Sequence, residues 1–177
     1  MAVFDFSAPL PDRLYWDSSF LVNVSFAAAK FHQPCADYYY RLKEAEAPVL
    51  LSNLVLDETW YILLKLEAEY LYEPQSFWDI YRQEPDRLQP ILGTLRDFTQ
   101  RLIHLPYVTL VGTEANAYEM ALQTMERSLL LPRDAYHWAL MQAHGLSAIA
   151  TTDADFTRIP ESTIYTCNET ILAQHSR

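Results

Sequence analysis

Four carboxylates in this sequence stand where a short apolar run ends or where a helix begins. Asp17 and Asp153 each follow such a run, while Glu58 and Asp134 lie in the first turns of predicted helices. If these groups converge, they repel one another, because two unit charges 4 Å apart cost about 1 kcal/mol in water and about 4 kcal/mol at an effective dielectric of 20. A divalent cation removes that conflict, and oxygen ligands without a Cys or His cluster favour Mg²⁺ or Mn²⁺ over Zn²⁺.

Such an ion generates hydroxide from bound water and neutralises a phosphoryl transition state. Hydrolysis of phosphodiester bonds is therefore the reaction class that this pattern of acids predicts. The conclusion depends on whether the elements that carry the acids bring them to one place.

The elements alternate between strand and helix. We expect strands over residues 13–17, 49–51, 107–111 and 147–150, with a last edge strand at 164–166, after an irregular lead over residues 1–12. Helices are predicted over residues 19–31, 34–47, 114–131 and 134–144, and over about 20 residues from position 53 or 54. This order implies an α/β fold with a largely parallel sheet. Ligands bind beyond the carboxyl ends of the strands in such sheets, so the geometry allows the four acids to converge.

The chain has 177 residues, half of them hydrophobic, and is interpreted as one domain over residues 1–177. A segment rich in proline and aromatic residues, about 72–106, is interpreted as a helical insertion, and we expect helices over about 76–83 and 87–102 that form a hairpin or lid. No apolar run is long enough for a membrane helix, and the N-terminus lacks a basic signal-peptide region. With only two cysteines, we expect a cytoplasmic protein with no disulfide framework.

The formal net charge of −10 disfavours nonspecific nucleic-acid binding through bulk charge. It does not exclude a local basic rim around an acidic site. Its simplest explanation is solubility.

Each candidate residue also has a purely structural explanation. Asp17 and Asp134 could be helix N-caps, Glu58 could be a solvated helix residue, and Asp155 could make a turn. His137 has no partner in the sequence, so it is expected to be packed or hydrogen-bonded in the fold. The acids taken together are much harder to explain in this way than each one alone.

Four motifs together resemble the PIN-domain ribonucleases, especially the VapC-like toxins of bacterial toxin–antitoxin pairs. They are Asp17-Ser18-Ser19-Phe20 after a strand, Ser52 with Glu58 six residues later, Arg133-Asp134-Ala135 with His137 in a helix that ends at Gly145, and Thr151-Thr152-Asp153-Ala154-Asp155-Phe156. The resemblance covers nearly the whole chain, and its closing segment is the most specific part. It implies an α/β/α sandwich around a mostly parallel sheet, Mg²⁺ or Mn²⁺ in the acidic cluster, and RNA as the substrate.

Position by position, the resemblance implies catalytic and metal-binding roles for a set of four acids, joined at the metal by an accessory acid: Asp17, Glu58, Asp134 and Asp153, with Asp155. Ser18 occupies the place of a hydroxyl residue that supports the first of these acids, and Thr151 is similar at the end of the last strand. Metal-bound water would attack the phosphate without a protein nucleophile.

Three arginines, Arg13, Arg133 and Arg158, lie near the predicted rim and could contact phosphates, although a solvated surface position explains each of them equally well.

The first hypothesis is therefore a metal-dependent endoribonuclease, a toxin restrained by a small antitoxin protein, with a homodimer suggested by the family. The alternative is a PIN-like module that binds RNA or protein without cutting it. A phosphotransfer protein or phosphatase is disfavoured, because Asp17 has no second aspartate two residues later.

Overall fold

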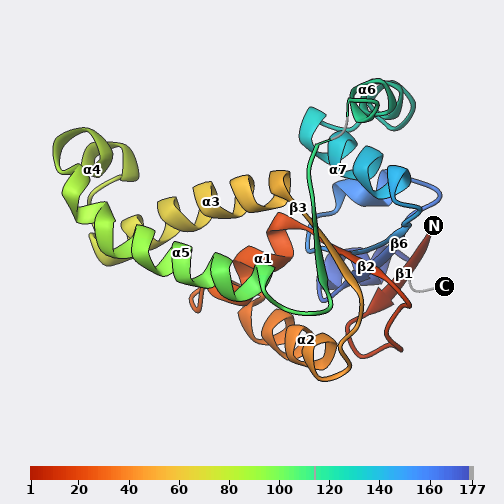
Figure 1. Cartoon of the computed structure of the whole chain (residues 1–177), viewed down its shortest axis with the longest axis horizontal. Coiled ribbons are helices and arrows are strands. Elements are labelled where there is room, and N and C mark those ends of the chain that lie inside the picture. Colours follow the sequence, from red (N-terminus) through yellow and green to blue (C-terminus); the bar gives the residue numbers. More distant parts are fainter. Residues whose placement is uncertain (114, 176–177) are drawn as a thin grey trace.

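The computed structural model describes residues 1–113 and 115–175 of the chain. Its described residues contain a six-stranded sheet in the order β1-β6-β5-β2-β3-β4, and every strand pairing is parallel (Figure 1). The strands are β1 (Ala2–Asp5), β2 (Leu14–Trp16), β3 (Val49–Ser52), β4 (Val108–Val111), β5 (Ala148–Ala150) and β6 (Thr163–Thr166). The expected α/β fold with a parallel central sheet is confirmed.

Helices cover the sheet on both sides. Helices α1 (Ser18–Ser25) and α2 (His32–Glu44) pack together on one side, and α6 (Ala117–Ser128) and α7 (Pro132–Ala143) pack together on the other (Figure 1). The remaining helices are α3 (Asn53–Leu71), α4 (Phe77–Gln83), η1 (Pro85–Leu88), α5 (Gln89–Ile103), η2 (Asp155–Arg158) and α8 (Glu169–His175). No helix in the described ranges has both the length and the apolar content needed to cross a membrane.

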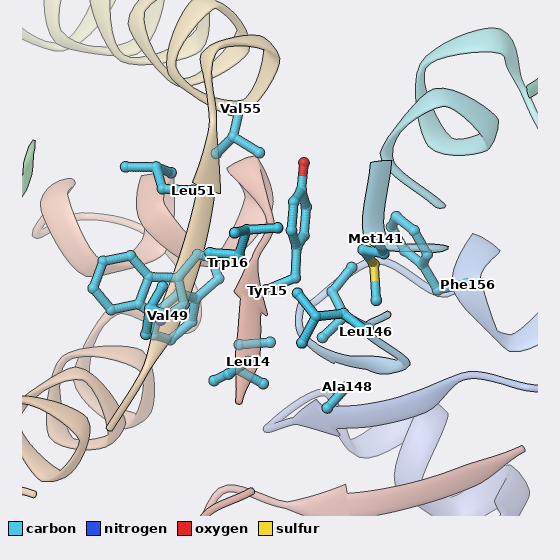
Figure 2. Packing of buried hydrophobic residues seen from close by; sticks show 14 of the residues in the cluster. Leu14, Tyr15, Trp16, Val49, Leu51, Val55, Met141, Leu146, Ala148 and Phe156 are labelled. Atoms are coloured by element: carbon cyan, nitrogen blue, oxygen red, sulfur yellow. The ribbon is translucent and has the colours of Figure 1, made fainter. Parts of the chain in front are cut away.

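The centre of the sheet is apolar on both faces. Every residue of β2, β3 and β5 is buried, as expected for parallel strands covered by helices on both sides. Figure 2 shows the ring of Tyr15 standing between Val55 on one side and Met141 and Phe156 on the other. This packing holds β2 at the centre of the molecule, directly before Asp17.

The N-terminal lead differs from its prediction. Residues Ala2–Asp5 form the edge strand β1, which pairs with β6, so the strand at 163–166 lies inside the sheet and not at its edge. The strand β1 pairs on one side only and two of its four residues are exposed, so it carries neither a buried apolar run nor clear alternation.

Two predicted helices are shorter than expected. The first ends at Ser25 and not at Phe31, because the side chain and carbonyl of Asn23 bind Phe31 N and His32 Nδ1 and fold residues 26–31 into turns. The helix expected over 114–131 spans Ala117–Ser128 and ends at Leu129, whose φ of 52° is left-handed. Its predicted start at Glu114 lies outside the described residues.

The N-termini of α1, α3 and α7 are capped in different ways. Asp17 caps α1 by accepting a hydrogen bond from Ser19 N, and Ser52 caps α3 by accepting one from Val55 N. Helix α7 starts at Pro132 and its N-cap residue, Leu131, makes no side-chain cap bond. Asp134 therefore lies in the first turn of α7 and is not the cap, which leaves its carboxylate free for another role.

The segment 72–106 forms α4, η1 and α5, which fold back along α3 into a helical arm that extends away from the sheet (Figure 1). The two main helices match those predicted from the sequence to within about two residues at each end. The arm has its own apolar cluster, built from residues such as Leu63, Ile80 and Leu95. Trp60 Nε1 also donates to Thr99 Oγ1 at 2.7 Å and ties α3 to α5.

Candidate active site

One pocket of about 560 Å³ brings together all five acids singled out in the sequence. They come from the turn after β2, from α3, from the first turn of α7 and from the turn after β5. The residues that line this acidic pocket are Asp17, Ser18, Ser19, Glu58, Ile62, Leu131, Pro132, Arg133, Asp134, Asp153 and Asp155. The convergence that the α/β topology allowed is thus observed, at the carboxyl ends of β2 and β5.

Asp17 is held rigidly at the base of the acidic pocket, where it is 4% exposed. Its Oδ2 atom accepts hydrogen bonds from Ser19 Oγ at 2.5 Å, from Thr151 Oγ1 at 2.7 Å and from Ser19 N at 3.3 Å. Thr151 Oγ1 in turn accepts from Asp153 N at 2.9 Å, so two of the acidic turns share one hydroxyl. These bonds fix one carboxylate oxygen and the orientation of the group.

The hydroxyl that supports Asp17 is therefore that of Ser19, whereas the sequence pointed to Ser18. The reason is the cap geometry: the extended backbone of Asp17 turns its carboxylate back toward the second residue of α1. The Ser18 side chain is buried and hydrogen-bonds to Glu58 instead. Thr151 is placed next to Asp17, as the sequence suggested.

Glu58 is 6% exposed and is flanked by two nitrogen donors. Its Oε2 atom lies 2.9 Å from His137 Nε2, and its Oε1 atom lies 3.3 Å from Arg133 Nη1. Burial alone would raise the pKa of Glu58, but its hydrogen bond and electrostatic interaction with His137, the hydrogen bond from Ser18 and the charge of Arg133 together lower it below its ordinary value. Glu58 is therefore an ionised carboxylate inside the protein.

The pKa values of Asp134 and Asp153 are raised, in contrast to that of Glu58. Burial, together with the charges of Asp153 and Asp17, raises the pKa of Asp134 to about 6. Burial and the charge of Asp17 also raise the pKa of Asp153, against the hydrogen bond that Asp155 N donates to Asp153 Oδ1 at 2.9 Å. The carboxylates of the acidic pocket thus repel one another in the absence of a cation.

His137 is a residue that the motifs included without assigning it a role. It is 1% exposed, with Nδ1 2.8 Å from the Tyr15 hydroxyl and Nε2 2.9 Å from Glu58 Oε2. The sequence-based expectation of a packed, hydrogen-bonded histidine is confirmed, although its two partners, from β2 and α3, could not be identified without the fold.

The three candidate RNA-contacting arginines lie in different places. Arg133 lines the acidic pocket with a side chain that is 60% exposed. Arg158 is paired with Asp155 at 3.3 Å, next to the acidic pocket. Arg13 precedes β2 and donates a hydrogen bond to the carbonyl of His144, which follows α7. It therefore lies at the amino ends of the strands, opposite the end that carries the pocket. The structure therefore does not bring Arg13 to the site.

A family model for the PIN domain matches residues 14–162, a span that includes every acid of the pocket. The chain belongs to the PIN-domain family. No curated protein has a detectable sequence match to it.

Solved structures share the fold of this PIN domain. VapC20 of Mycobacterium tuberculosis, a toxin that cleaves the sarcin–ricin loop, has a TM-score of 0.54 and 22% identity over 83% of this chain and 95% of its own. DNA-bound VapBC from Salmonella typhimurium has a TM-score of 0.54 and 15% identity over 87% of this chain and 97% of its own. VapBC2 from Rickettsia felis, bound to a promoter DNA fragment, has a TM-score of 0.52 and 14% identity over 87% of this chain and 98% of its own. These neighbours show that the chain has the fold of VapC20 and of the VapC chains in VapBC complexes, as the sequence led us to expect.

Proposed function

We propose that this PIN domain is a metal-dependent endoribonuclease that hydrolyses RNA phosphodiester bonds in its acidic pocket. The observation that carries the proposal is the convergence of five carboxylates from four separate segments on one pocket. A protein that needed these residues only for capping or solubility would gain nothing from gathering them in one pocket, because their mutual repulsion costs stability.

The donor set fits Mg²⁺ or Mn²⁺. The acids of the pocket offer oxygen ligands only, and they combine Glu58, whose pKa is lowered, with Asp134 and Asp153, whose pKa is raised by burial and by neighbouring charge. We assign metal binding and catalysis to Asp17, Glu58, Asp134 and Asp153, with Asp155 as an additional acid beside the metal. A bound ion of this kind activates water for attack and stabilises the charge that develops on the phosphate.

The protein's own groups would orient this chemistry. Ser19 and Thr151 fix the carboxylate of Asp17 through its Oδ2 atom. Arg133 places an exposed guanidinium at the mouth of the acidic pocket, where it would contact a phosphate of the RNA backbone. Arg158 would take a similar role beside Asp155.

We further propose that the chain is a toxin neutralised by a small antitoxin protein. The shared fold with VapBC complexes supports this partner, and so does an apolar groove of about 740 Å³ on the helical arm. The groove is lined by residues that include Leu56, Trp60, Leu92 and Leu110, and it suits an amphipathic segment of a partner chain. A homodimer is the further assembly suggested by the family, and we expect the protein to act in the cytoplasm.

The test is cleavage of a mixed RNA substrate by wild-type protein in Mg²⁺, in Mn²⁺ and in EDTA. We expect cleavage with either metal and none in EDTA. Asp17→Asn should lower the rate by more than the roughly 10- to 100-fold that loss of an outer-sphere partner costs. Asp57→Asn is the matched control, because Asp57 is an exposed acid on α3, one residue before Glu58 and outside the acidic pocket.

Cleavage that survives EDTA or Asp17→Asn would contradict the assignment of the site. Metal binding without cleavage would favour the alternative, a non-catalytic PIN-like binding module. The toxin assignment also requires that a small partner protein encoded beside this chain abolish cleavage in the same assay.

A further inference from the structure

A chain of buried polar side chains lies directly behind the acidic pocket. Tyr15 and Ser52 are fully buried and His137 is 1% exposed. The Tyr15 hydroxyl lies 2.7 Å from Ser52 Oγ and 2.8 Å from His137 Nδ1, and His137 Nε2 lies 2.9 Å from Glu58 Oε2. The chain starts at the N-cap of α3, passes through β2 and α7, and returns to α3 at Glu58.

Only one arrangement of hydrogens lets a neutral imidazole use every donor in this chain. An ionised carboxylate can only accept, so His137 Nε2–H donates to Glu58. Nδ1 of the neutral ring then accepts from the Tyr15 hydroxyl, and the Tyr15 oxygen accepts from Ser52 Oγ–H. Ser52 Oγ in turn accepts from Val55 N at 3.2 Å. The donor or acceptor role of each group therefore determines the role of the next group in the chain.

We propose that His137 is a positioning residue for Glu58 and that Tyr15, anchored by Ser52, fixes the tautomer and the orientation of its ring. This inference rests on the proposed role of Glu58 as a metal ligand. Tyr15, Ser52 and His137 contribute no atom to the walls of the acidic pocket, yet they determine where one of its carboxylates points. Hydrogen bonding of a ligating carboxylate by such outer partners commonly tunes metal affinity.

The same arrangement excludes His137 itself as a ligand. One ligand atom each from Asp17, Glu58 and His137 lies within 4.8 Å of the others, a spacing that a metal ion could bridge. However, Nε2 donates its hydrogen to Glu58 and Nδ1 accepts from Tyr15, so neither nitrogen has a lone pair to offer. The site consequently presents oxygen ligands only, which favours Mg²⁺ and Mn²⁺ over Zn²⁺.

The test measures Mn²⁺ affinity by calorimetric titration in the absence of RNA. Tyr15→Phe removes only the hydroxyl that fixes the ring, and we expect Mn²⁺ binding to weaken roughly 10-fold. Tyr38→Phe is the matched control, because the Tyr38 hydroxyl is also buried but has no hydrogen-bond partner among the described residues. His137→Gln, whose amide N–H can replace Nε2–H, should retain more affinity than His137→Leu.

A second measurement does not depend on any variant. Nitrogen-15 NMR of the wild-type histidines, recorded well above the ordinary histidine pKa of about 6.5, should show the neutral His137 ring as the tautomer that carries its hydrogen on Nε2. A hydrogen on Nδ1, or equal Mn²⁺ affinities for Tyr15→Phe and Tyr38→Phe, would overturn the inference. Wild-type protein that binds Mn²⁺ but cuts no RNA would contradict the proposed function alone, since neither measurement uses RNA.

Discussion

At the scale of single residues, the electrostatic conflict in the acidic pocket is concentrated on Asp134. Its pKa of about 6 is caused by burial and by the nearby charges of Asp153 and Asp17. Glu58, in the same pocket, has its pKa lowered because His137, Ser18 and Arg133 favour its charged form against the effect of burial. Two carboxylates in one pocket thus differ because hydrogen bonds and positive charge favour the ionised form of Glu58, whereas the charges of Asp153 and Asp17 oppose that of Asp134.

The raised pKa of Asp134 predicts how the metal-free protein responds to pH. The ordinary aspartate pKa is about 3.9, so the folded state binds this proton more tightly than the unfolded state does between roughly pH 4 and pH 6. The carboxyl therefore makes the protein less stable as the pH rises through that window. Asp134→Asn should be as stable as wild type near pH 4 and more stable at pH 7.5, by roughly 1 kcal/mol after discounting for solvent exposure.

Urea unfolding in EDTA at the two pH values measures this difference. Adding Mg²⁺ at pH 7.5 should remove it, because the cation stabilises the wild-type carboxylate and not the amide. A stability difference that is the same at both pH values would contradict the electrostatic account of this residue.

At the scale of elements, the sheet and the helical arm have separate apolar clusters. Ile80 on α4 is fully buried in the cluster of the arm, which includes Phe77, Leu88 and Ile91. Asp17, Asp153 and Asp134 are instead positioned by β2, β5 and α7, whose buried residues belong to the cluster of the sheet. Loss of packing in the distal part of the helical arm should therefore have little effect on the structure of the acidic pocket.

Ile80→Ala tests this separation. A buried isoleucine truncated to alanine costs about 2–5 kcal/mol, and we expect the loss to appear as faster hydrogen exchange in α4, η1 and the start of α5. Amides of β2 and β5, and the affinity for Mn²⁺, should stay close to wild type. Leu92→Ala is the control, because Leu92 lies on α5 with 43% of its surface exposed. Faster exchange in β2 would mean that arm and sheet unfold as one unit.

How far the elements could be predicted depended on how deeply each one is buried. The strands β2, β3 and β5 are buried on both faces and appear in the sequence as apolar runs, so they were found. The edge strand β1 was missed because its residues are partly exposed and show no apolar pattern, so that only their pairing with β6 makes them a strand.

The same limit applied to the site. The acids were identifiable because strand ends and helix starts share one edge of a parallel sheet. The choice of Ser19 over Ser18 and the partners of His137 depend on side-chain directions, which no spacing encodes. Arg13 was expected near the rim of the acidic pocket. It precedes β2, however, and so lies at the amino end of this strand, whereas the pocket lies at the carboxyl end.

At the scale of the whole molecule, acidic groups outnumber basic ones by 23 to 13, and five of the acids line the pocket where RNA would bind. A polyanion should therefore bind poorly until cations neutralise the pocket. We expect the affinity of the wild-type protein for a labelled, hydrolysis-resistant analogue of single-stranded RNA to rise on addition of Mg²⁺ at constant ionic strength. Fluorescence anisotropy measures this affinity.

The salt dependence of that binding should be shallow, because few lysines and arginines are available to release counterions from the RNA. Tight binding in EDTA with a steep salt dependence would show instead that a basic surface elsewhere on the molecule holds the RNA.

The buried chain from Ser52 through Tyr15 and His137 to Glu58 also has a consequence for how the sequence can diverge. Its members come from β2, β3, α3 and α7, and each leaves a buried donor or acceptor unsatisfied when its neighbour is replaced, at a cost of about 1–3 kcal/mol. Replacing two neighbours together by apolar residues of similar shape avoids most of that cost. Relatives that lose the histidine should therefore also differ at Tyr15 and at Ser52, so that these positions, up to 122 residues apart, are inherited as a group.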